Sequence, residues 1–219
     1  MMSSILNPNI ISAAKSSFEC ICFQLLEEAY ICIKNKNIIS HDYEEDSISL
    51  YLVDEMNQTH TAIKRHITVH TQEPIIPMAT NTRRLSIKQV PRIDICFGGF
   101  DIDARHTFHM EAKNLYETNV KKTGKKNKIN AKQYIKRYID TGIQHIVSNR
   151  YPQNSALIGY VLNGSPTNII NMINQEITSL TSHRESISII QNTQYTQLII
   201  GESCHNQVTH IKHCFLDFS

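Results

Sequence analysis

Three charged residues on two short apolar segments are the strongest chemical signal in this sequence. Asp94 lies in the segment 92–97 (RIDICF), and Glu111 and Lys113 lie in the segment 107–113 (TFHMEAK). Both segments have the composition of short buried strands. Residues two apart on a strand share a face and lie about 6 to 7 Å apart, so Glu111 and Lys113 point the same way. Pairing of the two strands would bring Asp94 beside them.

This grouping suits a divalent metal ion and a phosphodiester. Two carboxylates this close repel each other, and one takes up a proton unless a cation lies between them. Mg²⁺ binds one or two carboxylates and completes its shell with water and substrate phosphate. Lys113 would orient the attacking water or stabilise charge on the phosphate, and a pKa lowered by burial would also permit a base role. The alternative is an exposed strand face with a cross-strand ion pair, which the apolar flanking residues disfavour.

Length and composition allow one domain with a full hydrophobic core. The chain has 219 residues, of which 41% are hydrophobic and 19% are charged. A net charge of +2 is too small to indicate a nucleic-acid binder by itself. A basic segment nevertheless follows the second charged strand. Such a run is often only a solvated loop, but here its position favours contact with phosphate. Its lysines are Lys121, Lys122, Lys125, Lys126 and Lys128.

Several functional classes are disfavoured by what the sequence lacks. It contains no apolar run of the length that a membrane span needs and no pattern typical of a signal peptide, so we expect a cytoplasmic protein without a membrane partner. It also has no glycine-rich phosphate loop, which argues against a nucleotide-driven motor or a dehydrogenase. No serine or cysteine stands in a nucleophile-elbow setting.

Hydrophobic periodicity and turn residues predict a single α/β domain over residues 1–219. Its parts are a helical extension (1–40), a core (42–165) and a C-terminal helix with strands (166–219). Gly98 and Gly99 are expected to link the two charged strands, and Thr141-Gly142 to stop a helix. An irregular connection is expected over 78–89. Helices are predicted at 12–34, 47–57, 130–138 and from Ser165-Pro166, and strands at 66–71, 92–97, 107–113, 144–148, 156–162, 187–190, 197–200 and 208–215.

Asp94 followed by Glu111-Ala112-Lys113 resembles the motif of the PD-(D/E)xK nuclease superfamily. One departure is that Ile93 stands where the motif has proline, the nearest proline being Pro91. The resemblance implies a restriction-endonuclease-like core, with a central mixed sheet flanked by helices. The implied order is a helix, three strands, a helix and a further strand, which would be 144–148 or 156–162.

The resemblance also implies roles for individual residues. Asp94 and Glu111 would ligate Mg²⁺, for which Mn²⁺ can substitute, and Lys113 would complete the catalytic set. The first core helix of the family often supplies another acid. We select Glu45 for this role, with Glu44 and Asp46 as competitors. The simpler alternative is that these acids favour the helix N-terminus through its dipole.

These observations predict a metal-dependent deoxyribonuclease that hydrolyses DNA phosphodiester bonds. Residues 138–161 are also similar to small restriction-type proteins of bacterial defence systems, which suggests a setting in restriction or anti-phage defence. DNA would be the partner, within a homodimer or a larger defence complex. The alternative is a catalytically inactive nuclease-fold subunit that binds nucleic acid or a protein. The expected nucleic-acid contacts are Lys121, Lys122, Lys125, Lys126, Lys128 and Arg137.

Overall fold

The protein is an α/β fold built on one mixed sheet. The computed structural model describes residues 8–75, 91–101, 104–124, 128–152, 154–180, 186–190, 194–205 and 209–219. The strands are β1 (Ile67–Pro74), β2 (Arg92–Asp101), β3 (Ala104–Tyr116), β4 (Ala156–Asn163), β5 (Ser188–Ile189), β6 (Ile199–His205) and β7 (Thr209–Asp217). They form one seven-stranded sheet in the order β1-β2-β3-β4-β7-β6-β5. The prediction of an α/β fold with a central mixed sheet is therefore confirmed.

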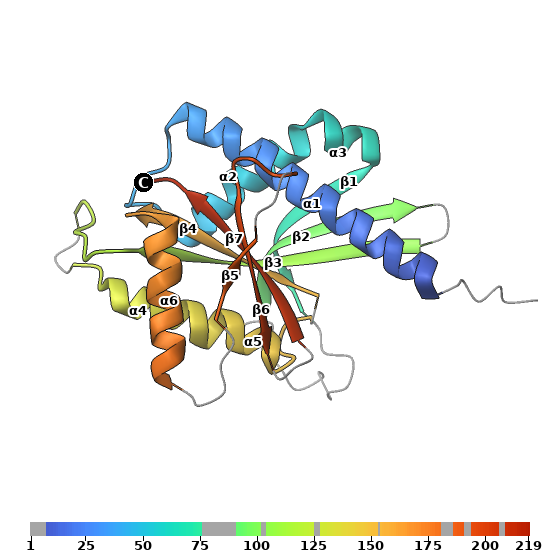
Figure 1. Ribbon diagram of the computed structural model, residues 1–219. Coiled ribbons are helices and arrows are strands. Elements are labelled where there is room, and N and C mark those ends of the chain that lie inside the picture. Colours follow the sequence, from blue (N-terminus) through green and yellow to red (C-terminus); the bar gives the residue numbers. More distant parts are fainter. Residues whose placement is uncertain are drawn as a thin grey trace, which may run out of the picture.

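Helices cover both faces of this sheet (Figure 1). They are α1 (Pro8–Lys36), α2 (Glu45–Gln58), α3 (His60–Arg65), α4 (Ala131–Arg137), the π-helical turn η3 (Tyr138–Ile143), α5 (Gln144–Val147) and α6 (Pro166–Leu180). One core cluster joins α1 and α2 to the sheet through residues such as Leu26, Leu52 and Met110. A second cluster joins η3, α5 and α6 to the opposite face through residues such as Ile146 and Ile173.

The strand connections follow from which pairs are parallel. β1, β2 and β3 form an antiparallel meander. β3 and β4 are parallel, and such a pair needs a long crossover connection. The segment from α4 to α5 supplies this crossover. Apart from the short helix α3 that follows α2, the element order from α2 to β4 is helix, three strands, a helical crossover and a strand. β7 adds in parallel to β4, and β6 and β5 follow antiparallel.

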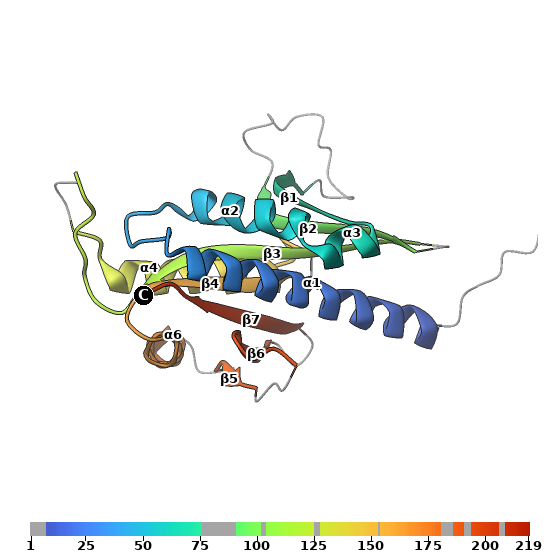
Figure 2. The same cartoon turned by 90° about the horizontal axis from the view of Figure 1, so that it is seen from above.

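The expected link at Gly98 and Gly99 is wrong, because both glycines lie inside β2. The β2–β3 hairpin is longer than predicted, and α1 runs beside it (Figure 2). A Cβ atom on Gly99 would come within 2.6 Å of the Phe18 ring of α1. The glycine therefore permits close packing of helix on strand. The predicted connection at 78–89 lies outside the described residues.

The predicted helix stop at Thr141-Gly142 and the predicted strand at 144–148 are also wrong. The chain continues from α4 through η3 into α5 without leaving helical geometry. Gly142 lies against Leu157 of β4, where an added Cβ would be 3.3 Å from the leucine side chain. The glycine lets this face of the helix approach the sheet. The further strand is therefore β4, the other of the two candidates.

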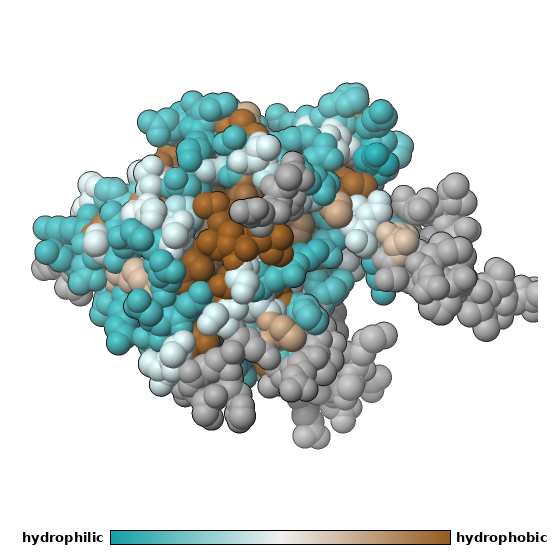
Figure 3. All heavy atoms as spheres, viewed as in Figure 1, coloured by the Kyte–Doolittle hydropathy of each residue, from teal (hydrophilic) through white to brown (hydrophobic). Residues whose placement is uncertain are grey.

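The C-terminal part matches its prediction more closely. Ser165 caps α6 by accepting a hydrogen bond from the backbone of Asn168 at 3.2 Å. β5, β6 and β7 lie within two residues of the predicted starts. An apolar patch lies over these strands on the face in Figure 3. At the β5 edge, Ile189 and Ile190 are exposed.

Candidate functional site

The site begins where β2 and β3 separate. The pairing of the two strands begins with Ile95 opposite Met110, and Asp94 is the β2 residue immediately before Ile95, just outside the paired region. Its Oδ2 atom accepts a hydrogen bond from the backbone N–H of Ala112 at 2.8 Å. A side-chain carboxylate thus bonds a backbone group of the neighbouring strand. Asp94 is only 6% exposed, so its position is fixed inside the molecule.

Lys113 stands at the centre of the site. Its Nζ atom is 2.5 Å from Glu111 Oε1 and 2.6 Å from the carbonyl oxygen of Ala112. It is also 3.5 Å from Glu45 Oε1 and 3.9 Å from Asp94 Oδ2. Carboxylates from α2, β2 and β3 therefore surround one ammonium group. The structure brings together all four residues that the sequence analysis selected as catalytic.

Burial shifts the pKa values of charged groups in this cluster. The pKa of Glu111 is raised to about 8, mainly by burial; Asp94 also raises it, and Lys113 opposes the shift. The pKa of Asp94 is likewise raised by burial. Burial alone would lower the pKa of Lys113, but Glu111, Glu45 and Asp94 outweigh it and raise that pKa. Lys113 is therefore an ammonium ion at neutral pH, which suits charge stabilisation better than a base role.

The three acids before and within α2 have different partners. Glu45 accepts hydrogen bonds at Oε2 from the backbone of Asn114 at 2.9 Å and at Oε1 from Arg137 at 3.4 Å. Glu44 instead forms an ion pair with Lys122 at 3.1 Å. Of the three acids, Glu45 is thus the one that contacts Lys113 directly. A cleft of about 200 Å³ opens here, lined by Glu44, Glu45, Asp46, Asn114, Tyr134 and Arg137.

Two further residues of the site were missed by the sequence analysis. Gln72 of β1 donates from Nε2 to Asp94 Oδ1 at 3.0 Å and to Asp46 Oδ1 at 3.3 Å. Tyr151 donates its hydroxyl to Glu111 Oε1 at 3.2 Å. Gln72 lies before the motif and Tyr151 lies 40 positions after Glu111, and neither has a spacing signal that points to the site.

The predicted nucleic-acid contacts fall into three groups. Lys121 and Lys128 are exposed and pair through a backbone bridge, and the Arg137 side chain is half-exposed. Lys122 is buried, and its ammonium binds the backbone oxygen of Tyr43 at 3.2 Å as well as Glu44. Through these two contacts Lys122 holds the segment that leads into α2. Two of the predicted contacts, Lys125 and Lys126, lie outside the described residues.

The donor set around Lys113 fits a hard divalent cation. Two buried carboxylates and the carbonyl of Ala112 lie within 3.9 Å of Lys113 Nζ, and oxygen atoms of this kind are the ligands that Mg²⁺ or Mn²⁺ prefers. Within the described ranges, Glu111 Oε2 is buried with no hydrogen-bond partner. In the same ranges, no group of three or more His, Cys, Asp or Glu side chains is arranged to hold a metal ion. An ion held by Asp94 and Glu111 would take its remaining ligands from water, as Mg²⁺ does.

Comparison with known proteins assigns no family. No family model, curated protein or solved structure matches this chain. Among the residues that the structure describes, no helix has the length and apolarity needed to cross a membrane. The functional argument therefore rests on the geometry of the site itself.

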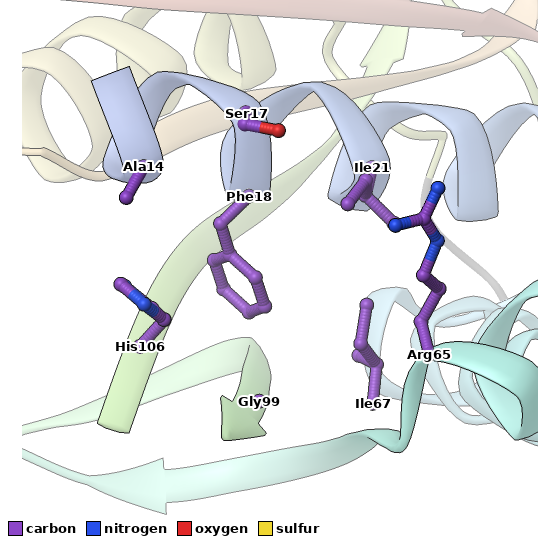
Figure 4. A pocket seen from close by; sticks show the side chains of 8 residues that line it. All are labelled: Ala14, Ser17, Phe18, Ile21, Arg65, Ile67, Gly99 and His106. Carbon is purple, nitrogen blue, oxygen red and sulfur yellow. The ribbon is translucent and has the colours of Figure 1, made fainter. Parts of the chain in front are cut away.

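A second cavity, of about 230 Å³, lies between α1, the end of α3 and the β2–β3 hairpin (Figure 4). Phe18 and His106 stand at one side of it and Arg65 at the other. Gly99 in its wall is five residues from Asp94 along β2, which corresponds to roughly 16 Å. The cavity is thus separate from the carboxylate cluster, and its lining brings together no set of acids comparable to that cluster.

Proposed function

We propose that this protein is a metal-dependent deoxyribonuclease with a restriction-endonuclease-like core. The single observation that carries the proposal is the convergence of Glu45, Asp94 and Glu111 on the ammonium of Lys113. Buried charges of this kind are costly to maintain, and they concentrate at functional sites. The charge arrangement suits hydrolysis of a phosphodiester.

The fold supports the proposal independently of the motif. The resemblance implies a helix, three strands, a helix and a further strand, and the elements from α2 to β4 follow this order apart from the short helix α3 between α2 and β1. It also implies an acid from the first core helix, and Glu45 stands at the start of α2 within 3.5 Å of Lys113. Element order and acid placement therefore agree with one family architecture.

Asp94 and Glu111 would hold Mg²⁺ or Mn²⁺, with the carbonyl of Ala112 nearby. When bound, the ion would polarise the scissile phosphate and lower the pKa of a water molecule. Lys113 is a buried cation, so it would orient the water and stabilise negative charge on the phosphate. Tyr151 holds the Glu111 carboxylate through one hydrogen bond. Glu45 is fixed by Asn114 and would help to set the position of Lys113.

Cleavage of supercoiled plasmid DNA tests the proposal. We expect the purified protein to nick or linearise plasmid with Mg²⁺ or Mn²⁺ and to be inactive with EDTA. Lys113→Ala and Asp94→Asn should each lower the cleavage rate by about 100-fold or more, because the first removes the cation that stabilises the phosphate and the second removes a charged metal ligand. Asp54→Asn is the matched control. Asp54 lies on α2 but forms its hydrogen bond with Gln58, outside the cluster.

The outcomes separate the proposal from its main alternative. Cleavage that persists in Lys113→Ala, with folding verified by circular dichroism, would exclude this site as the catalytic one. Binding of DNA without cleavage under any divalent metal would favour an inactive nuclease-fold subunit. One observation favours that alternative: Lys113 already bonds Glu111 and approaches Glu45 and Asp94, so the cluster is partly neutralised by its own chain.

A further inference from the structure

Gln72 has a backbone conformation that side chains other than glycine seldom adopt. Its φ angle is +56°, in the left-handed region, although it lies inside β1. L-residues with a long side chain pay a free-energy cost there, and such residues concentrate at functional sites. A favourable contact near Gln72 is therefore expected to offset the cost of this conformation.

The register of the sheet shows what this conformation achieves. Thr71 pairs with Ile95 and Glu73 pairs with Ile93, so Gln72 lies opposite Asp94 between two paired positions. Its Nε2 atom donates to Asp94 Oδ1 at 3.0 Å. The left-handed residue thus accompanies a side-chain contact to Asp94 at the point where regular pairing is interrupted.

With this contact, both oxygens of the Asp94 carboxylate are fixed. Oδ1 accepts from Gln72, and Oδ2 accepts from the backbone of Ala112 at 2.8 Å. A carboxylate held at both oxygens cannot rotate without losing a hydrogen bond. Its remaining lone pairs are then presented in a fixed direction, which favours a ligand that needs defined geometry.

The same amide also reaches a second acid. Gln72 Nε2 is 3.3 Å from Asp46 Oδ1, so one neutral donor group lies between Asp46 and Asp94. An amide has two N–H groups and can donate to both. It thereby separates two carboxylates that would otherwise repel each other, without adding the positive charge that would compete with a metal ion.

We propose that Gln72 is a positioning residue for the reaction, which orients Asp94 for metal binding and links it to Asp46 on α2. This inference rests on the proposed nuclease function, because the metal site is part of that proposal. Gln72 donates hydrogen bonds to Asp94 and Asp46 and, among the residues that the structure describes, forms none with Glu111 or Lys113. Its effect is therefore expected on metal affinity and rate rather than on the identity of the product.

Gln72→Met tests the inference, because methionine keeps the length of the side chain and the same backbone demand but removes the amide. We expect half-saturation by Mn²⁺ in isothermal titration calorimetry, and in plasmid cleavage, to require about 10-fold more metal. The thermal midpoint of the metal-free protein should stay close to wild type. Gln58→Met is the matched control, since Gln58 Nε2 also donates to a carboxylate, that of Asp54, but outside the site.

The results separate this inference from the proposed function. If wild type binds Mn²⁺ and cleaves DNA but Gln72→Met has the same Mn²⁺ affinity and rate, the positioning role is wrong and the nuclease proposal stands. A variant that loses affinity only in proportion to a lowered thermal midpoint also overturns it. If wild type neither binds Mn²⁺ nor cleaves, both proposals fail together. Gln72→Asn, which tolerates the left-handed conformation and keeps an amide, should recover part of the lost affinity.

Discussion

Lys113 is the cation that Glu45, Asp94 and Glu111 share. It is 4% exposed and lies within 4 Å of three carboxylates, at distances of 2.5, 3.5 and 3.9 Å. Removing one partner of a buried ion pair typically costs about 3 to 5 kcal/mol, because the remaining charge is left uncompensated. The consequence for stability does not depend on whether the protein is a nuclease.

We expect Lys113→Met to lower the free energy of unfolding by roughly 3 kcal/mol at neutral pH. Glu111→Gln alone should change it by less than about 1 kcal/mol, because Glu45 and Asp94 still lie within 3.9 Å of the Lys113 ammonium. In the double variant, Glu111→Gln should recover part of the loss. Urea unfolding of the four proteins measures the coupling as a double-mutant cycle. Strictly additive effects would mean that Lys113 does not compensate Glu111.

A second residue-scale prediction concerns His213, which is completely buried on β7. Its Nδ1 is 2.8 Å from the Tyr138 hydroxyl and its Nε2 is 2.7 Å from the Ser203 hydroxyl. Burial lowers the pKa of His213 to about 3, with a smaller contribution from His205. The folded protein therefore holds this histidine neutral down to strongly acidic pH.

The unfolded chain takes up the proton near pH 6.5, so the depressed pKa stabilises the fold fully above that pH. Stability should fall by about 1.4 kcal/mol per pH unit as the pH drops from 6.5 toward 3. Urea unfolding at several pH values should give a shallower slope for His213→Gln than for wild type. His210→Gln is the control, because His210 is exposed on the same strand. An unchanged slope in His213→Gln would refute the assignment.

At the scale of elements, β4 is the middle strand of the sheet, and its residues belong to the core clusters on both faces. Gly159 lies at its middle, and an added Cβ would come within 2.5 Å of Leu115 and 2.7 Å of Phe215. These neighbours belong to β3 and β7, the two strands that pair with β4. Close packing at this position therefore sets how the three central strands meet.

We expect Gly159→Ala to lower the free energy of unfolding by about 1 to 3 kcal/mol, as overpacking of a core does. Gly98→Ala in β2 is the matched control. A Cβ there would be no closer than 3.4 Å to its nearest neighbour, Thr68, and the effect should be within about 0.5 kcal/mol. Chemical denaturation of both variants tests the difference. Equal stability of the two would show that the sheet adjusts freely around Gly159.

The elements that the sequence predicted well are those with a strong local pattern. The helix at 47–57 and the strand at 156–162 correspond to α2 and β4 within two residues. The errors at Gly98-Gly99 and at the helix stop Thr141-Gly142 share one cause, and the wrong strand at 144–148 followed from that stop. Glycine reads as a turn or stop in a sequence, whereas here Gly99 and Gly142 accommodate neighbouring side chains from α1 and β4. Such close approaches are tertiary and leave no local signal.

In the site, too, the residues with a local sequence pattern were predicted and those placed by tertiary contacts were not. Glu111 and Lys113 were predictable, because strand alternation places residues two apart on one face. Asp94 followed from pairing of neighbouring strands. Gln72 and Tyr151 were not, since their side chains reach the acids from positions 22 and 40 residues away in the chain. The backbone bond from Ala112 to Asp94 also depends on where two strands separate, which the sequence alone does not indicate.

At the scale of the whole molecule, the site joins the two layers of the fold. Glu45 comes from α2 on one face, while Tyr151 follows the crossover that covers the other. The acids meet at the sheet, and the exposed basic residues Lys121 and Lys128 lie on the connection between β3 and α4. A polyanion bound along that connection would run beside the cleft at Glu45 and Arg137.

The net charge of +2 makes this local distribution decisive, because the whole molecule attracts a polyanion only weakly. If Lys121 and Lys128 each neutralise one phosphate, log K for DNA binding should fall with log salt concentration at a slope near −0.9 per contact. The double variant Lys121→Ala/Lys128→Ala should therefore flatten that slope by roughly 1.8. Fluorescence anisotropy with a labelled duplex over a series of salt concentrations measures it, with Ca²⁺ in place of Mg²⁺ to limit cleavage.

Lys64→Ala supplies the control, because Lys64 is exposed on α3, away from the connection between β3 and α4. The single variants Lys121→Ala and Lys128→Ala each remove one charge, as the control does, so comparing them with it at equal ionic strength separates local contacts from a general loss of positive charge. An unchanged slope in the double variant would place the phosphate contacts elsewhere on the molecule. A flattened slope with an unchanged cleavage rate at saturating DNA would assign these lysines to binding and leave catalysis to the carboxylate cluster.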